Sequence, residues 1–247
     1  MVVRGEDVAL ENQGVRGACS GHPQHFTAAI FDLDGTIIAS SQLHLQTFNE
    51  ILSRYGVTIP EESWYDHYEG TGSRHILQTV LARHGLLKTA PVEELRAERE
   101  KLFQDRARAQ LLPTKGFPLF YEELRRLGTP RMIATNGSEE EVRFILQLLK
   151  LEEERFVTAG EAGKLKPDPA VYLLACERLG VPPAKAVIFE DSVPGVVAGK
   201  RAGAYLVALL TTTTKERLAA AGADLIVKDF TSLTPALFFQ PRRLAKR

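Results

Sequence analysis

The sequence predicts an α/β protein with a doubly wound, mostly parallel sheet and an α-helical unit inserted after the first strand. From about residue 116 onward, short apolar runs rich in Val, Ile and Ala alternate with helical patterns, which is typical of parallel strands joined by helices. Residues 39–112 lack strand-like runs. A length of 247 residues, 44% hydrophobic and 25% charged, suits one large soluble domain that contains an insert.

Strands and helices are expected to alternate along the core. The strands are expected at 28–31 (AAIF), 131–135 (RMIAT), 186–189 (AVIF), 204–210 (AYLVALL) and 224–227 (DLIV), and helices at 117–128, 138–150, 169–180 and 194–203. Ser138 and Glu141 have the spacing of a capping box at the start of the second helix. Asp168 and Pro169 are suited to start the third helix, and Gly180 to end it.

The insert is expected to form four helices, at 40–56, 61–70, 73–85 and 91–110. Because it follows the first strand directly, it is expected to cap the carboxyl end of that strand, where open α/β sheets bind ligands. The core would then comprise residues 26–38 and 113–235, and the cap residues 39–112. The rings of Trp64, Tyr65, His67 and Tyr68 would fill the cap or line the cleft beneath it, and His75 and His84 are expected on the surface or in the core.

Residues outside this core and the overall charge limit the partners. Residues 1–25 are expected to form a flexible extension and residues 236–247 a basic tail. With 31 basic and 31 acidic side chains, the chain has no overall field that favours nucleic acid or membrane. Cys19 and Cys176 form no disulfide framework, and Cys176 is expected in the core, so we expect a cytoplasmic protein, a monomer or weak dimer.

Four segments place polar groups at or just beyond the ends of predicted strands. Asp32 and Asp34 follow the first strand, and Thr135-Asn136-Gly137 ends the second. Lys166 lies in GKLKPDP, and Glu190-Asp191 follows AVIF. Because parallel strands end at the same edge of a sheet, these groups are expected to converge.

The motifs FDLDGT, ATN, KPDP and FEDSVPGV, in this order, resemble the four motifs of the haloacid dehalogenase superfamily. The resemblance spans roughly Phe26 to Phe230 and implies a Rossmann-like core. A helical insert just after the first motif resembles the C1-cap branch, which contains β-phosphoglucomutase and many small-molecule phosphatases. Four motifs in order on matching elements are far more specific than one.

The resemblance implies a role for the two acids of the first motif. Asp32 would be the nucleophile that attacks phosphorus and forms an aspartyl-phosphate. Asp34 would protonate the leaving oxygen and then take a proton from the attacking water or alcohol. A calcium loop is excluded because the required glycine and third-ligand spacings are missing.

The second and third motifs would bind the transferring phosphoryl group. Thr135 would offer its hydroxyl, and the backbone amides around Asn136 and Gly137 would contact phosphoryl oxygens at a helix start. A lysine would neutralise the charge of the nucleophile and the phosphoryl group. Lys164 and Lys166 are both candidates, and the resemblance selects Lys166 because it directly precedes a proline.

The fourth motif implies a magnesium cofactor. Asp191 and Glu190, with Asp32 and the backbone carbonyl of Asp34, would provide the oxygen ligands that Mg²⁺ prefers. Without a cation these carboxylates would repel one another and an incoming phosphate.

The cap residues resemble the mutase only in part. Ser40 and His44 lie where the mutase has a threonine and a histidine, whereas an aspartate common in this branch is replaced by Ala39. Arg74 lies near the position of the mutase's phosphate-binding arginine, although the local glycine spacing differs by one residue. The cap lysine of the mutase has no clean counterpart in this sequence, and Lys101 is the nearest candidate. His44 and Arg74 are therefore expected to bind substrate.

These residues are consistent with three functions. The leading prediction is a Mg²⁺-dependent phosphatase that hydrolyses a small phosphomonoester, with a sugar phosphate as the leading substrate class. The first alternative is a phosphomutase of the β-phosphoglucomutase type, which uses the same core, and the remote alternative is a non-catalytic binding protein on this fold. A dehalogenase is disfavoured because the acid set of the first and fourth motifs suits a cation and phosphate.

Overall fold

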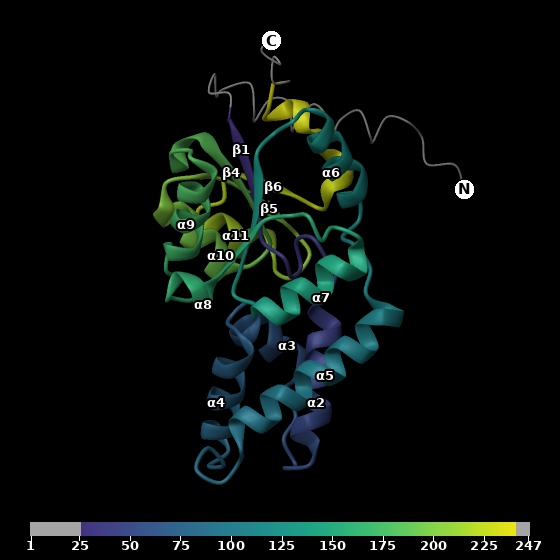
Figure 1. The fold of residues 1–247 in the computed structure, drawn as a ribbon. Coiled ribbons are helices and arrows are strands. Elements are labelled where there is room, and N and C mark those ends of the chain that lie inside the picture. The colour runs from purple at the N-terminus through teal and green to yellow at the C-terminus, as the bar shows by residue number, and fades with distance from the viewer. Residues whose placement is uncertain (1–25, 241–247) are drawn as a thin grey trace, which may run out of the picture.

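The computed structural model describes residues 26–240 and contains one six-stranded parallel sheet in the order β3-β2-β1-β4-β5-β6 (Figure 1). The expectations for residues 1–25, with Cys19, and for 241–247 lie outside the described residues. The strands are β1 (Ala28–Phe31), β2 (Arg131–Thr135), β3 (Phe156–Thr158), β4 (Ala186–Glu190), β5 (Tyr205–Leu209) and β6 (Leu225–Val227). The doubly wound α/β fold predicted from the sequence is confirmed, with β3 as a strand that the sequence patterns missed.

The middle of the sheet is apolar because helices cover both of its faces. Every residue of β1 and of β4 is buried. β1 pairs with β2 on one side and with β4 on the other, so that Ile30 lies opposite Met132 and Ile188. The chain reverses its direction of strand addition between β1 and β4, which is the topological switch point where such sheets bind ligands.

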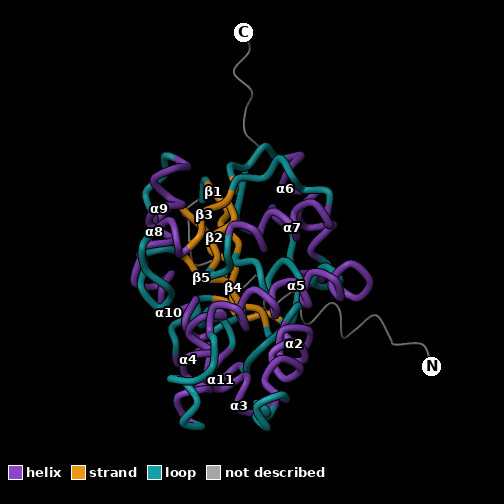
Figure 2. Tube along the Cα trace, turned by 60° about the horizontal axis from the view of Figure 1, so that its bottom comes forward, coloured by secondary structure: helices purple, strands orange, loops and turns teal. Residues whose placement is uncertain are grey.

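Two helical layers flank the sheet, as the orange strands between purple helices show in Figure 2. One layer contains α6 (Phe117–Arg126) and α7 (Glu139–Leu149), and the other contains α8 (Ala159–Ala162), α9 (Ala170–Leu179), α10 (Val193–Ala202) and α11 (Lys215–Ala220). Cys176 of α9 points into the core, as expected. The core continues beyond the expected boundary at 235, because Phe238 and Phe239 are buried and Phe238 packs edge-on against Phe189.

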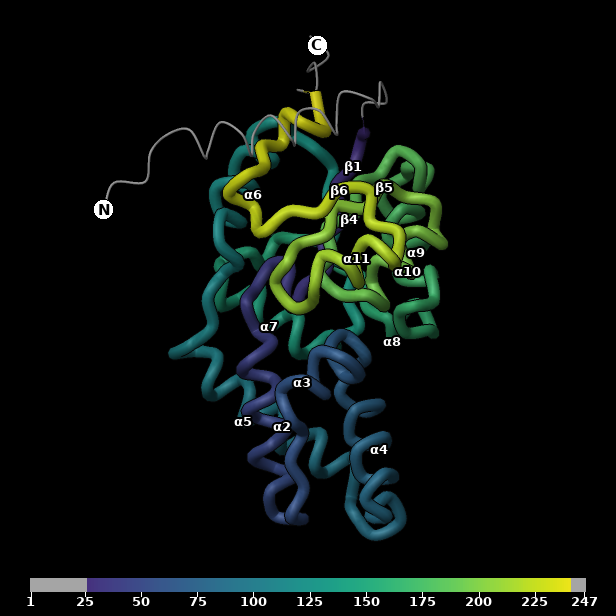
Figure 3. The backbone as a smooth tube through the Cα atoms, turned by 180° about the vertical axis from the view of Figure 1, so that it is seen from behind, coloured from purple at the N-terminus to yellow at the C-terminus, as the bar shows by residue number. Residues whose placement is uncertain are grey.

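The insert forms a separate helical bundle beyond the carboxyl ends of the strands (Figures 1 and 3). It consists of α2 (Ser41–Ser53), α3 (Glu61–Ser63), the π-helical turn η1 (Trp64–Tyr68), α4 (Ser73–Arg83) and α5 (Val92–Gln110). Trp64 and Tyr68 fill its apolar interior, whereas His67, His75 and His84 are exposed. The two crossings between bundle and sheet lie side by side, because the amide of Ala39 donates to the carbonyl of Leu112 at 3.0 Å.

No helix among residues 26–240 is both long and apolar enough to cross a membrane.

Candidate active site

The carboxyl ends of β1, β2 and β4 meet around one buried lysine. Lys166, from the loop before α9, donates to a carboxylate oxygen of Asp32, to Glu190 Oε1 at 2.8 Å and to the Ala134 carbonyl at 3.0 Å. Burial alone would lower the pKa of Lys166, but the adjacent carboxylates of Asp32 and Glu190 raise it to about 12. The lysine is therefore a fixed positive charge between β1 and β4. Lys164, in contrast, is exposed and pairs with Asp168.

Asp32 lies directly after β1 and is almost completely buried. Burial raises its pKa well above the usual range for aspartate, even though Lys166 acts in the opposite direction. One of its oxygens accepts from Lys166. A buried carboxylate that lies beside a single lysine and near further acids is suited to react with, or to bind, an incoming electrophile or cation.

Glu190 orients its neighbours, because its two oxygens accept five hydrogen bonds from the protein. Oε1 accepts from Lys166 and from the Tyr172 hydroxyl, both at 2.8 Å. Oε2 accepts from the amides of Asp191 and Ser192 and from the Ser192 hydroxyl. These donors occupy the lone pairs of Glu190. Its carboxylate is therefore better suited to orient neighbouring groups than to bind a metal ion, the role that the resemblance implied.

Asp191 and Gly35 are closely packed against each other. The two oxygens of Asp191 accept from Thr36 at 2.8 Å and from Thr212 at 2.7 Å, which leaves one lone pair on each oxygen. Gly35 has φ +74°, and a Cβ atom there would lie 2.1 Å from Asp191 Oδ2. Only glycine therefore allows the turn after β1 to approach this carboxylate.

Asp32, Glu190 and Asp191 form a group whose ligand atoms lie within 4.8 Å of one another. Burial and the neighbouring carboxylates raise the pKa of Asp191 well above its usual range. An all-oxygen donor set with excess negative charge fits a hard cation such as Mg²⁺. A second group of Asp34, His44 and Glu141 satisfies the same distance criterion, but the Arg99 guanidinium already provides positive charge there.

Asp34 is bound by the first helix of the cap. Ser40 donates to Asp34 Oδ1 at 2.6 Å, and His44 Nε2 lies 2.8 Å from the same oxygen. Burial alone would raise the pKa of Asp34, but His44 and Ser40 outweigh it and hold the pKa below the usual range. Because Arg99 donates to His44 Nδ1, a neutral His44 must carry its proton on Nε2 and donate it to Asp34.

Arg99 is a cap residue of this site that the sequence reasoning missed. It is 1% exposed, and its guanidinium lies over the rings of Phe48 and Phe103 at 4.8 and 4.9 Å. Its Nη1 also lies 3.6 Å from Glu141 of α7. Lys101, the nearest candidate for the mutase's cap lysine, is exposed. The local signal for Arg99 is its spacing of four residues from Phe103 on one helical face, and this spacing does not by itself indicate burial.

Glu141 was expected to complete a capping box, and the structure bears out half of it. The Ser138 hydroxyl accepts from the Glu141 amide at 3.2 Å. The Glu141 carboxylate instead points toward Arg99 and His44, and its Oε1 lacks a hydrogen-bond partner among the described residues. Burial raises the pKa of Glu141 to about 8 although Arg99 lowers it. Glu141 therefore belongs to the contact between core and cap.

Thr135, Asn136 and Gly137 form a turn after β2. The Thr135 hydroxyl accepts from the Gly137 amide at 2.9 Å. Asn136 links three segments, because its Nδ2 donates to the Gly70 carbonyl of the cap at 2.7 Å and its Oδ1 accepts from the Lys166 amide at 3.0 Å. This asparagine thus connects the cap loop to the segment that carries the buried lysine.

Glu69 is a second cap residue that the sequence reasoning missed. It is 8% exposed, lines the same cavity as Asp32 and accepts from the Ser41 hydroxyl at 2.6 Å. Trp64 Nε1 in turn donates to the Ser41 hydroxyl at 2.9 Å. Burial raises the pKa of Glu69 to about 7.

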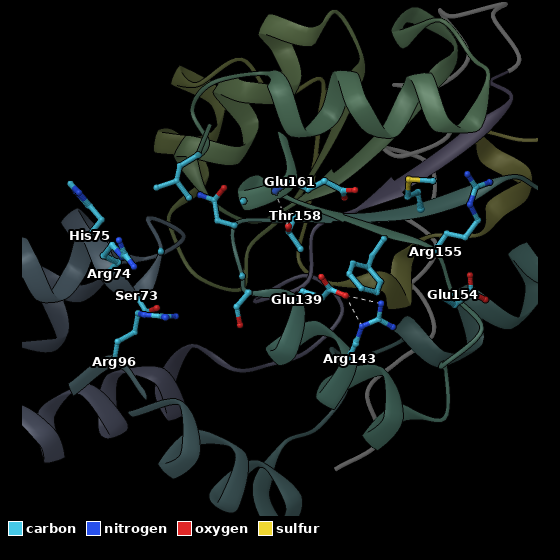
Figure 4. A pocket seen from close by; sticks show the side chains of 18 of the residues that line it. Ser73, Arg74, His75, Arg96, Glu139, Arg143, Glu154, Arg155, Thr158 and Glu161 are labelled. Atoms are coloured by element: carbon cyan, nitrogen blue, oxygen red, sulfur yellow. Dashed lines mark hydrogen bonds and ion pairs between the residues drawn. The ribbon is translucent and has the colours of Figure 1, made fainter. Parts of the chain in front are cut away.

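These residues enclose a cavity of about 80 Å³ between core and cap. Of the predicted site residues, the structure brings nine to its walls: Asp32, Asp34, His44, Thr135, Asn136, Gly137, Lys166, Glu190 and Asp191. Arg74 does not line this cavity. Its side chain is 61% exposed, pairs with Glu93 at 2.8 Å and lines a neighbouring cleft (Figure 4).

The chain is similar to several characterised proteins. Residues 26–203 match the family model described as haloacid dehalogenase-like hydrolase. The chain is 29% identical to validoxylamine A 7'-phosphate phosphatase of Streptomyces hygroscopicus subsp. limoneus, over 84% of this chain and 96% of the relative. It is 31% identical to a phosphorylated carbohydrates phosphatase of Thermotoga maritima, over 71% and 81%.

The solved structures agree in fold. The crystal structure of CbbY from Rhodobacter sphaeroides in complex with phosphate is 25% identical, with a TM-score of 0.73 over 86% of this chain and 99% of that one. β-Phosphoglucomutase from Clostridium difficile is 18% identical and is similar in fold, with a TM-score of 0.74 over 85% and 93%. The chain belongs to the haloacid dehalogenase-like hydrolase family, with the helical cap inserted after the first motif.

Proposed function

We propose that this protein is a Mg²⁺-dependent phosphatase that hydrolyses a sugar phosphate or similar phosphomonoester through an aspartyl-phosphate on Asp32. The observation that carries the proposal is the buried arrangement of Asp32 beside Lys166, with Asp34 two residues away and bound by the cap. Relatives named for phosphatase activity on phosphorylated carbohydrates support the substrate class.

In the first step, an Asp32 oxygen attacks phosphorus while the bond from phosphorus to the leaving oxygen breaks. Lys166 offsets the negative charge on Asp32 and on the phosphoryl oxygens, and the Thr135 hydroxyl is suited to donate to one of these oxygens. When bound, Mg²⁺ would be held by Asp32, Asp191 and the Asp34 carbonyl and would supply further positive charge to the phosphoryl group.

Asp34 moves the proton in both steps. The contacts from His44 and Ser40 favour its ionised form, which is the form that accepts a proton from the water that hydrolyses the phosphoenzyme. An arriving phosphate dianion opposes these contacts, because nearby negative charge raises the pKa of a carboxyl group. Asp34 can then carry the proton that the leaving oxygen takes.

The mutase remains a second candidate because His44, which lies where the mutase has a histidine, contacts Asp34 directly. It differs from the phosphatase only in the acceptor, which is a hydroxyl of a bound intermediate instead of water. Ala39 in place of the branch's usual aspartate and the position of Arg74 outside the cavity favour hydrolysis. Cytoplasmic residence and a small metabolite as the only partner, without nucleic acid or membrane, stay predictions.

A phosphate-release screen tests the proposal. We expect turnover of 4-nitrophenyl phosphate and of at least one sugar phosphate with Mg²⁺, loss of turnover in EDTA, and recovery when Mg²⁺ is restored. Asp32→Asn should abolish turnover with the circular dichroism spectrum unchanged, whereas Asp168→Asn, at a partly exposed position before α9, should retain it. Glucose 6-phosphate formed from β-glucose 1-phosphate without free phosphate would favour the mutase, and no turnover of any phosphate ester would favour the non-catalytic alternative.

A further inference from the structure

A cleft of about 990 Å³ adjoins the catalytic cavity, between the cap segment 72–75 and the core elements α7, β3 and α8 (Figure 4). The two spaces share wall residues, namely Gly72, Ser73, Asn136, Gly137 and Ser138. A molecule whose phosphate lies at Asp32 can therefore extend past the turn after β2 and into the cleft.

The sizes of the two spaces favour such an extension. The catalytic cavity, at about 80 Å³, is much smaller than the cleft. The cleft, at about 990 Å³, is within the range of small-molecule binding sites. The bulk of the leaving group therefore belongs in the cleft.

The cleft carries an excess of positive charge. Its walls include five arginines (Arg74, Arg96, Arg143, Arg155 and Arg178) and three acids (Glu139, Glu154 and Glu161). Arg74 and Arg96 share one carboxylate, that of Glu93, which does not line the cleft. A concave surface with an excess of positive charge attracts anionic ligands.

Two arginines on the core side are available to a ligand. Arg155 donates to the Arg178 carbonyl at 2.8 Å and has no ion pair with any carboxylate in the described part of the chain. Among the described residues the one carboxylate paired with Arg143 is that of Glu139, and both side chains are about two-thirds exposed, at 67% and 64%. Exposed pairs of this kind are weak. The Arg143 guanidinium also lies over the Phe156 ring at 5.2 Å. Both guanidinium groups therefore offer planar donors that match phosphate or carboxylate.

We propose that the cleft binds the distal part of an extended phosphomonoester, and that a second anionic group on this part contacts Arg143 and Arg155. The inference rests on the proposed phosphatase activity and adds the substrate class. The substrate is longer than a hexose phosphate and carries a phosphate or carboxylate at the end remote from the reacting phosphate.

The test compares three probes: glucose 6-phosphate, trehalose 6-phosphate and trehalose 6,6'-bisphosphate. We expect kcat/KM to rise in this order. The kcat/KM of the bisphosphate should exceed that of trehalose 6-phosphate by more than twofold, because a second reactive phosphate by itself accounts for a factor of two. In the double variant Arg143→Gln/Arg155→Gln, the ratio of bisphosphate to monophosphate should fall by about tenfold, since each exposed charge pair contributes up to about fivefold. A disaccharide bearing a terminal carboxylate in place of the second phosphate distinguishes the two anions.

The matched control is Arg125→Gln/Arg126→Gln, two exposed arginines on α6, which should leave the ratio unchanged. Equal ratios in wild type and the cleft variant would overturn the proposal. Binding separates this failure from failure of the phosphatase itself. In Asp32→Asn, calorimetry should show that the bisphosphate binds, and that its affinity falls when Arg143 and Arg155 are also replaced. This result does not depend on whether the wild type turns over the bisphosphate. An unchanged affinity would contradict the proposed role of the two arginines.

Discussion

At the scale of single residues, Lys166 and Lys164 form a natural pair for testing the role of buried charge. Lys166 is 5% exposed and bridges Asp32 and Glu190, whereas Lys164 pairs with Asp168 at the surface. Replacing Lys166 with Met should lower kcat by about 10²–10³, the usual cost of losing one preorganised charge at a reacting group. Lys164→Met should retain full kcat. Comparable losses in both variants would show that the lysine acts through fold stability, which a thermal melt of each variant measures.

Glu69 provides a pH prediction whose sign follows from burial. Its pKa is raised from 4.5 to about 7, so the folded state binds this proton more tightly than the unfolded state. The resulting stability is present below pH 4.5 and is lost as the pH rises toward 7. Relative to Glu69→Gln, the free energy of unfolding of the wild type should fall by on the order of 3 kcal/mol across this range.

Urea denaturation in EDTA at pH 4.5 to 8 measures this difference. Glu122→Gln, at a half-exposed position on α6, is the control and should follow the wild type at every pH. Parallel stability curves for the wild type and Glu69→Gln would rule out a buried, protonated Glu69.

Single residues also mark what the sequence could predict. The convergence of Asp32, Lys166 and Asp191 was predictable, because parallel strands end at one edge of a sheet. Arg99 and Glu69 were not, because a charged residue in a helical pattern is normally solvated. Their burial arises only where the cap packs against the core, a contact between segments far apart in the sequence.

At the scale of elements, α5 brings Arg99 to His44, which contacts Asp34, the proposed proton-transferring residue. Arg99→Met retains the packing against Phe48 and Phe103 but removes the donor to His44 Nδ1. We expect kcat/KM to fall by about 10- to 100-fold, part of what general acid–base catalysis supplies. The pKa of His44 should rise, because burial and Arg99 both lower it and Asp34 alone raises it.

An NMR titration of His44 measures this change separately from activity. Lys101→Met, an exposed replacement on the same helix, should alter neither the titration nor the rate. A rate loss without a change in the His44 pKa would assign Arg99 to packing alone.

The helices and strands differ in how well local patterns predict them. α7 was expected at 138–150 and spans Glu139–Leu149, because its cap and its apolar face act within one segment. The three-residue β3 was missed, because Phe156–Thr158 is too short for a period and follows the charged run 152–155. β3 is stabilised by its pairing with β2, a segment distant in the sequence, so its local sequence alone does not predict it.

At the scale of the whole molecule, the buried acids should couple metal binding to folding. Asp32 and Asp191, the proposed carboxylate ligands, follow β1 and β4 and lie beside the turn at Gly35, so they come together only in the folded chain. At Mg²⁺ a hundredfold above its dissociation constant, the folded state should gain about 2.7 kcal/mol. For a chain of this size that raises Tm by about 5–10 °C.

Burial raises the pKa of Asp32 and of Asp191, so protons compete with Mg²⁺ for both carboxylates. The increase in Tm should therefore grow as the pH rises and shrink as it falls, and scanning calorimetry with Mg²⁺ or EDTA at several pH values measures it. Asp191→Asn should lose most of the increase, whereas Asp168→Asn should retain it. If Mg²⁺ raised the Tm of the Asp191 variant as much as that of the wild type, Mg²⁺ would bind elsewhere. The four motif segments would then be held together by Lys166 and Glu190 without the metal.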